Sequence, residues 1–205
     1  MVDGFLTFCL WTSQICYLIC FIPQIITNFR MKSGKGISEF LLICYLNTYL
    51  FFMFYIFGLH LPMAYKIIVP LQALATIVLI AQRMYYDPSE FTNKWFWYVS
   101  NVFLFAFIVP YAFKEPLVVA FPFGWITFGL SLVNQLPQVV KIYQEKSVVG
   151  FSFLFVVFTG FAAFVETIAV FAAHLPLQSI VMALRGVVLF FVFCGLFLIY
   201  RTNNA

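Results

Sequence analysis

Residues 22–38 read IPQIITNFRMKSGKGIS, and residues 136–152 read LPQVVKIYQEKSVVGFS. A single shift of 114 residues superimposes the Pro-Gln pair, the Lys-Ser pair, the glycine and the final serine of the two stretches. The same shift lays the His-Leu-Pro of residues 60–62 on that of residues 174–176. Matches of Leu or Phe are expected between two apolar stretches, but matches of Pro, Gln, Lys, Gly and His at one shift are not. The chain is therefore predicted to contain two copies of one structural unit.

The composition assigns the chain to the membrane. Apolar residues make up 64% of the 205 residues and charged residues only 9%, with a mean hydropathy of +1.03. A typical globular domain is about 45–50% apolar and about 25% charged. So few charges cannot cover a soluble fold of this size, which excludes a soluble enzyme, a nucleic-acid-binding protein and a secreted disulfide scaffold. The five cysteines lie in apolar runs without a metal-binding spacing, so we expect neither a metal site nor a cofactor.

Seven stretches are long and apolar enough to cross a bilayer, which takes about 20 mostly apolar residues per helix. They cover roughly residues 5–29, 40–59, 63–84, 95–113, 117–142, 150–173 and 176–200. The third and fourth are separated by Tyr85-Tyr86-Asp87-Pro88-Ser89-Glu90, which is too polar for a hydrocarbon core. We therefore predict an all-α integral membrane protein with seven transmembrane helices.

Basic residues lie mostly on one side of these spans. That side receives Arg30, Lys32, Lys35, Arg83, Lys94, Lys141, Lys146 and Arg201, whereas the other receives only Lys66 and Lys114. Because cytoplasmic segments carry the excess of Lys and Arg, the first side is predicted to be cytosolic. The N-terminus is then outside or lumenal and the C-terminus cytosolic. An inner, plasma or lysosomal-type membrane would fit equally well.

Two copies of three spans, separated by one span, enter the membrane from the same side and form parallel repeats. We predict a 3+1+3 arrangement in which residues 1–84 form the first three-helix bundle, residues 85–116 carry a linker helix, and residues 117–205 form the second bundle. In transporters built from such repeats, the substrate site lies at the interface between them near the membrane midplane. The oligomeric state stays open.

A Pro-Gln pair followed by Lys-Ser-x-x-Gly-x-Ser, present twice in a seven-span chain, resembles the PQ-loop family. This family includes lysosomal amino-acid exporters such as cystinosin, and SWEET sugar transporters and the KDEL receptor are related in architecture. The resemblance implies that the two prolines take part in gating.

The gating prediction has its own basis in the chemistry of proline. Pro23 and Pro137 lie about two turns from the predicted cytosolic ends of spans one and five. A proline inside a helix removes a backbone hydrogen bond and kinks the axis, so each is a candidate hinge. Gln24 and Gln138 come next and are expected to bond either the freed backbone or the substrate. The alternative is that both prolines are only kinks, which are common in transmembrane helices.

Glu166 and Arg185 are the ionisable residues deepest in the predicted hydrocarbon region. An ion there costs at least about 2.5–3.5 kcal/mol. Both residues lie about 12–14 Å from the predicted outer surface, so we expect them to form an ion pair. Either this pair only neutralises itself, or Glu166 takes up a proton and Arg185 holds a substrate carboxylate. The first repeat carries Phe52 and Leu71 at the matching positions.

Further polar side chains are candidates for substrate contact. Ser152, Thr159 and Glu166 recur every seven residues on one face of span six. In cystinosin-like proteins the position of Thr159 holds an aspartate important for proton coupling, and the position of Asn134 holds a lysine. The predicted substrate-binding residues are Gln72, Asn134, Gln135, Thr159 and Arg185, with Glu166 for proton coupling.

These features favour a transporter of a small polar metabolite that works by alternating access, with protons as a candidate coupling ion. One acid and one base within the membrane favour an amino acid or related zwitterion as the substrate. A sugar, as in SWEET transporters, is one alternative, and a non-transporting membrane receptor or trafficking factor is another. The sequence contains no Ser/His/Asp set, metal cluster or phosphate loop, so we do not expect an enzyme. The expected partners are a small-molecule substrate and the lipid bilayer, and not nucleic acid.

Overall fold

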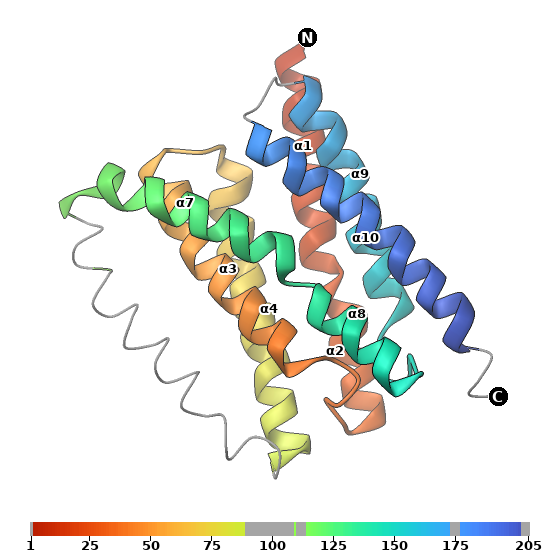
Figure 1. Cartoon of the computed structure of the whole chain (residues 1–205). Coiled ribbons are helices and arrows are strands. Elements are labelled where there is room, and N and C mark those ends of the chain that lie inside the picture. The colour runs from red at the N-terminus through yellow and green to blue at the C-terminus, as the bar shows by residue number, and fades with distance from the viewer. Residues whose placement is uncertain (1, 89–108, 110–113, 173–176, 202–205) are drawn as a thin grey trace.

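The computed structural model describes residues 2–88, 109, 114–172 and 177–201, which are helical apart from short connections and contain no strand (Figure 1). The helices are α1 (Val2–Ile19), α2 (Phe21–Met31), α3 (Glu39–Gly58), α4 (Met63–Tyr86), α7 (Pro116–Val133), α8 (Leu136–Glu145), α9 (Phe153–Ala172) and α10 (Leu177–Arg201). The all-α class predicted from the sequence is thus confirmed for these residues.

Six segments of the described chain are long and apolar enough to span a membrane. Two of them each consist of a pair of helices, α1 with α2 and α7 with α8. The six coincide with six of the seven predicted spans. The fourth predicted span, residues 95–113, lies almost wholly outside the described residues. The seven-span 3+1+3 count and the domain boundaries at residues 84 and 116 therefore stay predictions.

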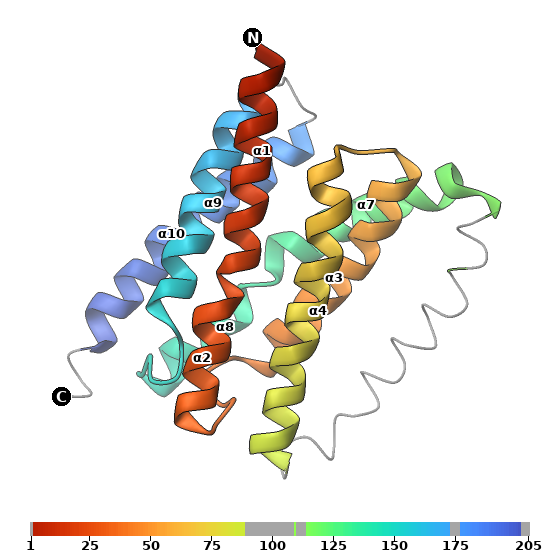
Figure 2. The same cartoon turned by 180° about the vertical axis from the view of Figure 1, so that it is seen from behind.

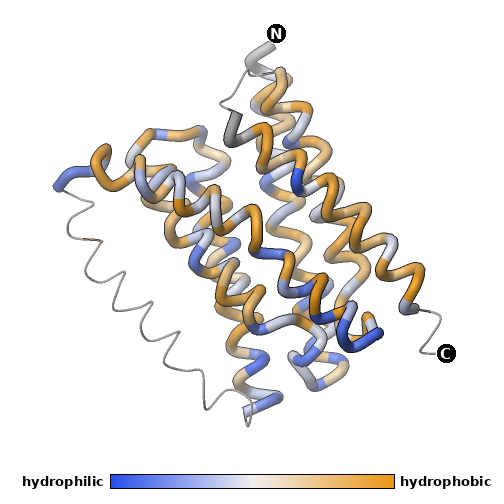
Figure 3. The backbone as a smooth tube through the Cα atoms, viewed as in Figure 1, coloured by the Kyte–Doolittle hydropathy of each residue, from blue (hydrophilic) through white to orange (hydrophobic). Residues whose placement is uncertain are grey.

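The outer surface of the helices is apolar, as a bilayer requires. Figure 3 shows hydrophobic colour along most of each helix and hydrophilic colour gathered at the end that carries residues 32–38 and 146–152. We call this end the loop end and the opposite one the far end. Large apolar side chains such as Phe8, Phe121, Phe191 and Leu198 are more than half exposed. Contiguous apolar surface of this kind suits contact with lipid rather than with water.

The helices of the two repeats pack in matching order (Figures 1 and 2). In the first repeat, α4 lies between α3 and the α1–α2 pair; in the second, α10 contacts both α9 and the α7–α8 pair. Between the repeats, α1 packs along α9 and α3 packs along α7. The first span of each repeat therefore lies against the second span of the other, as expected for two parallel copies that face each other.

Both two-part spans break where a proline removes a hydrogen bond. α1 ends at Ile19 and α7 ends at Val133, each four residues before the proline of its Pro-Gln pair. Proline has no N–H to offer the carbonyl four residues earlier, and its ring crowds that carbonyl. By contrast, Pro70 and Pro122 lie inside α4 and α7 without ending them. The chain therefore changes direction at equivalent places in the two repeats.

The main apolar core lies between the repeats in the half of the molecule near the loop end. Its buried members include Phe21, Leu42, Tyr45, Ile142, Phe151, Phe155 and Phe193. They come from both repeats, so this core holds the two copies together. Within a bilayer such packing stabilises through van der Waals contact, because lipid tails are as apolar as the side chains.

Candidate functional site

The two motif loops begin with the same backbone turn. α2 and α8 each end on a lysine in the left-handed region, Lys32 with φ 48° and Lys146 with φ 54°. After Lys32, the N–H of Ser33 returns to the carbonyl of Asn28 at 3.2 Å, which closes the end of α2. This turn directs residues 33–38 and 147–152 back across the loop end, where the two loops meet.

Gln24, the glutamine of the first motif, bonds the loop of the second repeat. Its side chain is fully buried, and its Nε2 donates to the carbonyl of Gly150 at 2.8 Å. Its Oε1 accepts from the N–H of Ser152, also at 2.8 Å. The side-chain amide of Gln24 thus bonds both a carbonyl and an N–H of the loop backbone. These groups have no partner within a helix or strand.

Gln138 makes the equivalent bonds in the opposite direction. Its Nε2 donates to the carbonyl of Gly36 at 3.0 Å, and its Oε1 accepts from the N–H of Ser38 at 2.6 Å. We call each set of two bonds a glutamine clamp. The prediction that these glutamines bond the freed backbone of their own helix is wrong, and contact with a substrate stays a prediction. Each one bonds the loop of the other repeat.

The two motif glycines touch between the clamps. A Cβ on Gly36 would overlap the carbonyl carbon and oxygen of Gly150. A Cβ on Gly150 would come within 2.8 Å of the Gly36 Cα, and Gly150 also has a φ of +80°, which favours glycine. The motif therefore requires glycine because two backbones pass with no room for a side chain. Together with the clamps, this contact closes the loop end.

The first loop has an additional anchor that the second cannot have. Arg83 on α4 donates from Nη1 to the carbonyls of Gly34 at 3.1 Å and Ile37 at 2.6 Å. One turn later, Asp87 accepts from the N–H of Gly34 at 2.7 Å. The shift of 114 residues places Phe197 and Arg201 at these positions in the second repeat. The loop of residues 33–37 is thus attached to α4 by side chains that have no counterpart in the other half.

Glu166 lies in a polar cluster built by three helices. Its carboxylate accepts from the Tyr17 hydroxyl at 3.0 Å, the Tyr65 hydroxyl at 3.3 Å and the Gln14 amide at 3.5 Å. Tyr17 and Gln14 come from α1 and Tyr65 from α4, whereas Glu166 lies on α9. The carboxylate of the second repeat is therefore held entirely by donors of the first repeat.

Arg185 bonds a different partner. Its Nη1 donates to the Asn134 side chain at 2.9 Å, and its buried Nε has no hydrogen-bond partner within the described part of the chain. The expected ion pair with Glu166 is absent from the contacts of these two residues, since Tyr17, Tyr65 and Gln14 take the carboxylate instead. Arg185 still attracts Glu166 electrostatically without direct contact.

Polar groups also lie where α7 gives way to α8. Asn134 and Gln135 connect these two helices and are buried. Gln135 crosses to the first repeat, where its Nε2 donates to the Tyr45 hydroxyl at 2.9 Å. The break near Pro137 thus places two buried amide side chains inside the bundle. Asn134 and Gln135 each use their amide to fix a residue that faces this interface.

Aromatic rings from three helices pack together beside these polar groups. Phe21, at the matching break in the first repeat, packs edge-on against Tyr45, Tyr49 and Phe155 at centroid distances of 6.2, 6.3 and 5.9 Å. Edge-to-face contacts at such distances are favourable arrangements of aromatic rings. These rings come from both repeats, so their packing joins the two copies in addition to the contact between the motif loops.

Comparison with known proteins agrees with the geometry of the two loops. A family model described as PQ loop repeat matches the chain twice, over residues 5–65 and 119–179. The two matches together cover more than half of the chain and are offset by the same 114 residues as the motifs. This chain belongs to the PQ-loop repeat family. The internal repeat inferred from the sequence is thereby confirmed.

One curated relative is a vacuolar transporter from yeast. Over 75 residues the chain is 32% identical to the vacuolar lysine transporter YPQ1 of Saccharomyces cerevisiae. The match covers 37% of this chain and 24% of that protein, so the chain spans about a quarter of the relative's length. The similarity agrees with an integral membrane protein.

The remaining predicted site residues of this PQ-loop protein lie inside the helical bundle. Gln72 is buried within α4. Thr159 bonds the carbonyl of Phe155 in its own helix at 2.7 Å and lines a small void together with Gln135. No group of three or more His, Cys, Asp or Glu side chains that could hold a metal ion occurs among residues 2–88, 109, 114–172 and 177–201.

Three tyrosines that were not predicted from the sequence take part in the site. Tyr17, Tyr45 and Tyr65 each bond one of the predicted site residues, but tyrosine is also common as an interfacial anchor in membrane proteins. The depth of Tyr17, near the middle of the first span, was the available signal. It places a hydroxyl about as far from the membrane surface as Glu166.

Replacing both Gln24 and Gln138 with Leu is expected to open the loop end. Leucine occupies a similar volume but leaves the backbone groups of both loops without partners, at a cost of about 1–3 kcal/mol for each buried group. The melting temperature of the purified protein should fall by about 5 °C or more. A single cysteine in place of Ser38, in a cysteine-free background, should react faster with a thiol reagent.

The matched control is Gln144→Leu, which removes an exposed amide from the same helix as Gln138. It should leave both readouts close to those of the unaltered protein. Equal melting temperatures for the double variant and this control would show that the glutamine clamps contribute nothing to closure.

Proposed function

We propose that this PQ-loop protein transports an amino acid across a membrane by alternating access, and that its loop end is closed in the conformation described here. The observation that carries this proposal is the reciprocal pair of glutamine clamps. Bonds exchanged between two repeats can break together when the repeats move apart, without disturbing either repeat. A closure of that kind, located next to buried polar groups at the repeat interface, is what an alternating-access transporter needs.

The far end supplies the complementary opening in this proposal. From their contact near the proline break, α7 and α10 diverge toward the far end (Figures 1 and 2). Tyr17, Glu166 and Arg185 lie within the bundle but each keeps part of its surface exposed. Exposed polar surface at that depth supports access for substrate from the far end while the loop end is closed.

The proline breaks act as hinges in the proposed cycle. α2 and α8 carry the clamping glutamines, and each is joined to a longer helix at a point where one backbone hydrogen bond is already missing. Bending there moves the glutamines away from the opposite loop with little further loss of bonding. Pro23 and Pro137 with Gln24 and Gln138 then form the gate as a unit.

An amino acid matches the charged groups of the interface. Arg185 is held by Asn134 and keeps a buried Nε donor, so it can donate to a substrate carboxylate. Glu166 offers a carboxylate that attracts an ammonium group and can also carry a proton between the two faces. The remaining polar contacts of the substrate are assigned to Gln72, Gln135 and Thr159. The lysine transporter among the relatives supports the same substrate class.

The excess of basic residues at the loop end supports a cytosolic position for that end. The N-terminus would then lie outside or in a lumen, and the C-terminus in the cytosol. Substrate would enter the described conformation from the outer or lumenal side. Labelling a single cysteine introduced at each end, in intact cells or vesicles, measures this orientation directly.

The proposal is tested by uptake into vesicles that contain the purified protein. Radiolabelled lysine, a neutral amino acid and glucose are each offered with and without a pH difference across the membrane. We expect saturable uptake of at least one amino acid, a response of that uptake to the pH difference, and no uptake of glucose. Uptake of glucose alone would replace the proposal with a sugar transporter, and no uptake of any class would contradict transport.

A further inference from the structure

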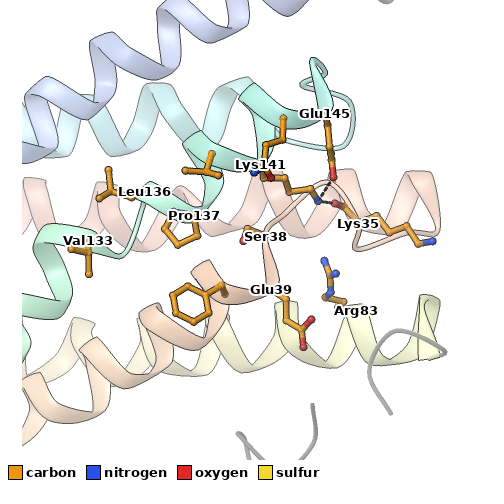
Figure 4. A pocket seen from close by; sticks show the side chains of 12 residues that line it. Lys35, Ser38, Glu39, Arg83, Val133, Leu136, Pro137, Lys141 and Glu145 are labelled. Atoms are coloured by element: carbon orange, nitrogen blue, oxygen red, sulfur yellow. Dashed lines mark hydrogen bonds and ion pairs between the residues drawn. The ribbon is translucent and has the colours of Figure 1, made fainter. Parts of the chain in front are cut away.

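A pocket opens at the loop end beside one of the glutamine clamps. It has a volume of about 680 Å³ and lies between the start of α3, the end of α4 and the α7–α8 break (Figure 4). Ser38 and Pro137 lie in its wall, so it adjoins the bond between Ser38 and Gln138. Both repeats contribute to this pocket.

The walls of the pocket differ in character. One wall is apolar and largely exposed, and it consists of Phe40, Val133, Leu136 and Val140. The other carries charged side chains, namely Lys35, Arg83, Lys141, Glu39 and Glu145. An apolar surface that faces the bilayer thus continues directly into a group with more basic than acidic side chains.

The repeat shows that these charges are not required by the fold. Shifting the basic residues of the pocket by 114 positions gives Val149, Phe197 and Thr27 in the other half. The same operation replaces the two acidic residues by Phe153 and Met31. Five positions that are charged in the pocket are therefore uncharged at their equivalents in the other half. A packing role shared by both repeats cannot explain this difference.

The basic groups of the pocket are held in place by backbone. Arg83 bonds the carbonyls of Gly34 and Ile37, as described above. Lys141 donates to the carbonyl of Lys35 and lies 3.5 Å from that of Ile37, and it pairs with Glu145 at 3.8 Å (Figure 4). Backbone carbonyls thus fix these two positive charges beside the pocket, where they can attract an anion. Glu145 itself is at the exposed rim.

We propose that this pocket binds the phosphate headgroup of an anionic phospholipid, with an acyl chain along its apolar wall. The basic side chains would bond the phosphate oxygens, as basic pockets between transmembrane helices do at the membrane surface. The apolar wall distinguishes such an amphiphile from a free phosphate ion. A bound lipid touches the first repeat at Ser38 and the second at Pro137, and therefore stabilises the closed loop end.

The test compares purified protein in nanodiscs of phosphatidylcholine with the same protein in nanodiscs that also contain phosphatidylglycerol. A ligand that binds the folded state raises the melting temperature. We expect phosphatidylglycerol to raise it by about 4 °C or more. In the double variant Lys35→Gln/Lys141→Gln, at least half of this rise should be lost. Each variant is compared with itself in the two kinds of nanodisc. The rise in melting temperature is therefore read separately from the basal stability of the variant.

The control variant Arg30→Gln/Lys146→Gln removes two positive charges from the same end but outside the pocket. It should retain the full rise with phosphatidylglycerol. An equal loss in both double variants would indicate attraction by net charge alone and would overturn the site. No rise in the native protein, or a rise unchanged by Lys35→Gln/Lys141→Gln, would also overturn it. An equal rise with inorganic phosphate in phosphatidylcholine nanodiscs would exclude a lipid as the ligand.

Discussion

Alanine in place of Gly36 is expected to prevent the loop end from closing and to lower transport by about 10-fold or more. The new Cβ would overlap the carbonyl group of Gly150. Because the obstructing atoms are backbone atoms, no rotation of a side chain can remove the overlap. Overpacking of this kind costs about 1–3 kcal/mol. The cost arises only in the closed conformation, because the two loops touch only there. The closed state is therefore disfavoured relative to the open one.

Uptake into vesicles measures this effect, and thiol labelling at Ser38→Cys reports the closure itself. Gly129→Ala is the matched control, because a Cβ at Gly129 would meet nothing within 4 Å. Gly129 lies in α7 rather than in a loop, but its substitution adds the same single methyl group. Uptake by Gly36→Ala within two-fold of the control would show that contact between the motif loops is not part of the cycle.

Glutamine in place of Glu166 is expected to remove the pH dependence of transport and to lower uptake by about 10-fold or more. Glutamine keeps the size of the side chain, but it neither titrates nor attracts a cation. The hydroxyls of Tyr17 and Tyr65 and the amide of Gln14 face the carboxylate, with Arg185 as the charged group that acts on it from a distance. None of the directly bonded partners carries a formal charge, so Glu166 is the group expected to exchange the proton.

Uptake is measured in vesicles at about pH 5 and about pH 7.5 for the native protein and the variant. Glu115→Gln serves as the control, since it removes an exposed carboxylate just before α7. That variant should keep both the rate and the pH response. A Glu166→Gln protein whose uptake still follows pH would assign the proton to another group and leave Glu166 a structural role.

The asymmetry between the repeats bears on both predictions. The second repeat holds Glu166 and Arg185, whereas the first provides the hydroxyls that bond Glu166 and the Arg83–Asp87 anchor of its own loop. Both copies thus contribute matching loops to the contact at the loop end, whereas the charged residues of the polar cluster belong to the second copy. A gate requires two surfaces that fit each other, whereas a site for one asymmetric substrate does not require equal halves.

Local chemistry allowed much of this architecture to be predicted from the sequence. Apolar runs of sufficient length mark the spans, because a bilayer admits only segments whose backbone groups are bonded internally. Pro23 and Pro137 mark the breaks, because a missing N–H acts on a carbonyl four residues away in the same helix. The doubled motif marks the repeat without reference to any contact. The six spans within the described residues and the two breaks lie where these signals place them.

The partners of the polar side chains were decided by the tertiary structure alone. Gln24 bonds a loop more than a hundred residues away, and Glu166 bonds tyrosines rather than Arg185. Depth in the membrane follows from counting residues along one helix, but contact also depends on how each helix is rotated and on which helix lies beside it. Those quantities arise from packing between segments far apart in the chain. The apolar helices, their repeat and their kinks thus follow from local sequence, whereas the contacts of the proposed gate and of the polar cluster depend on how the helices pack.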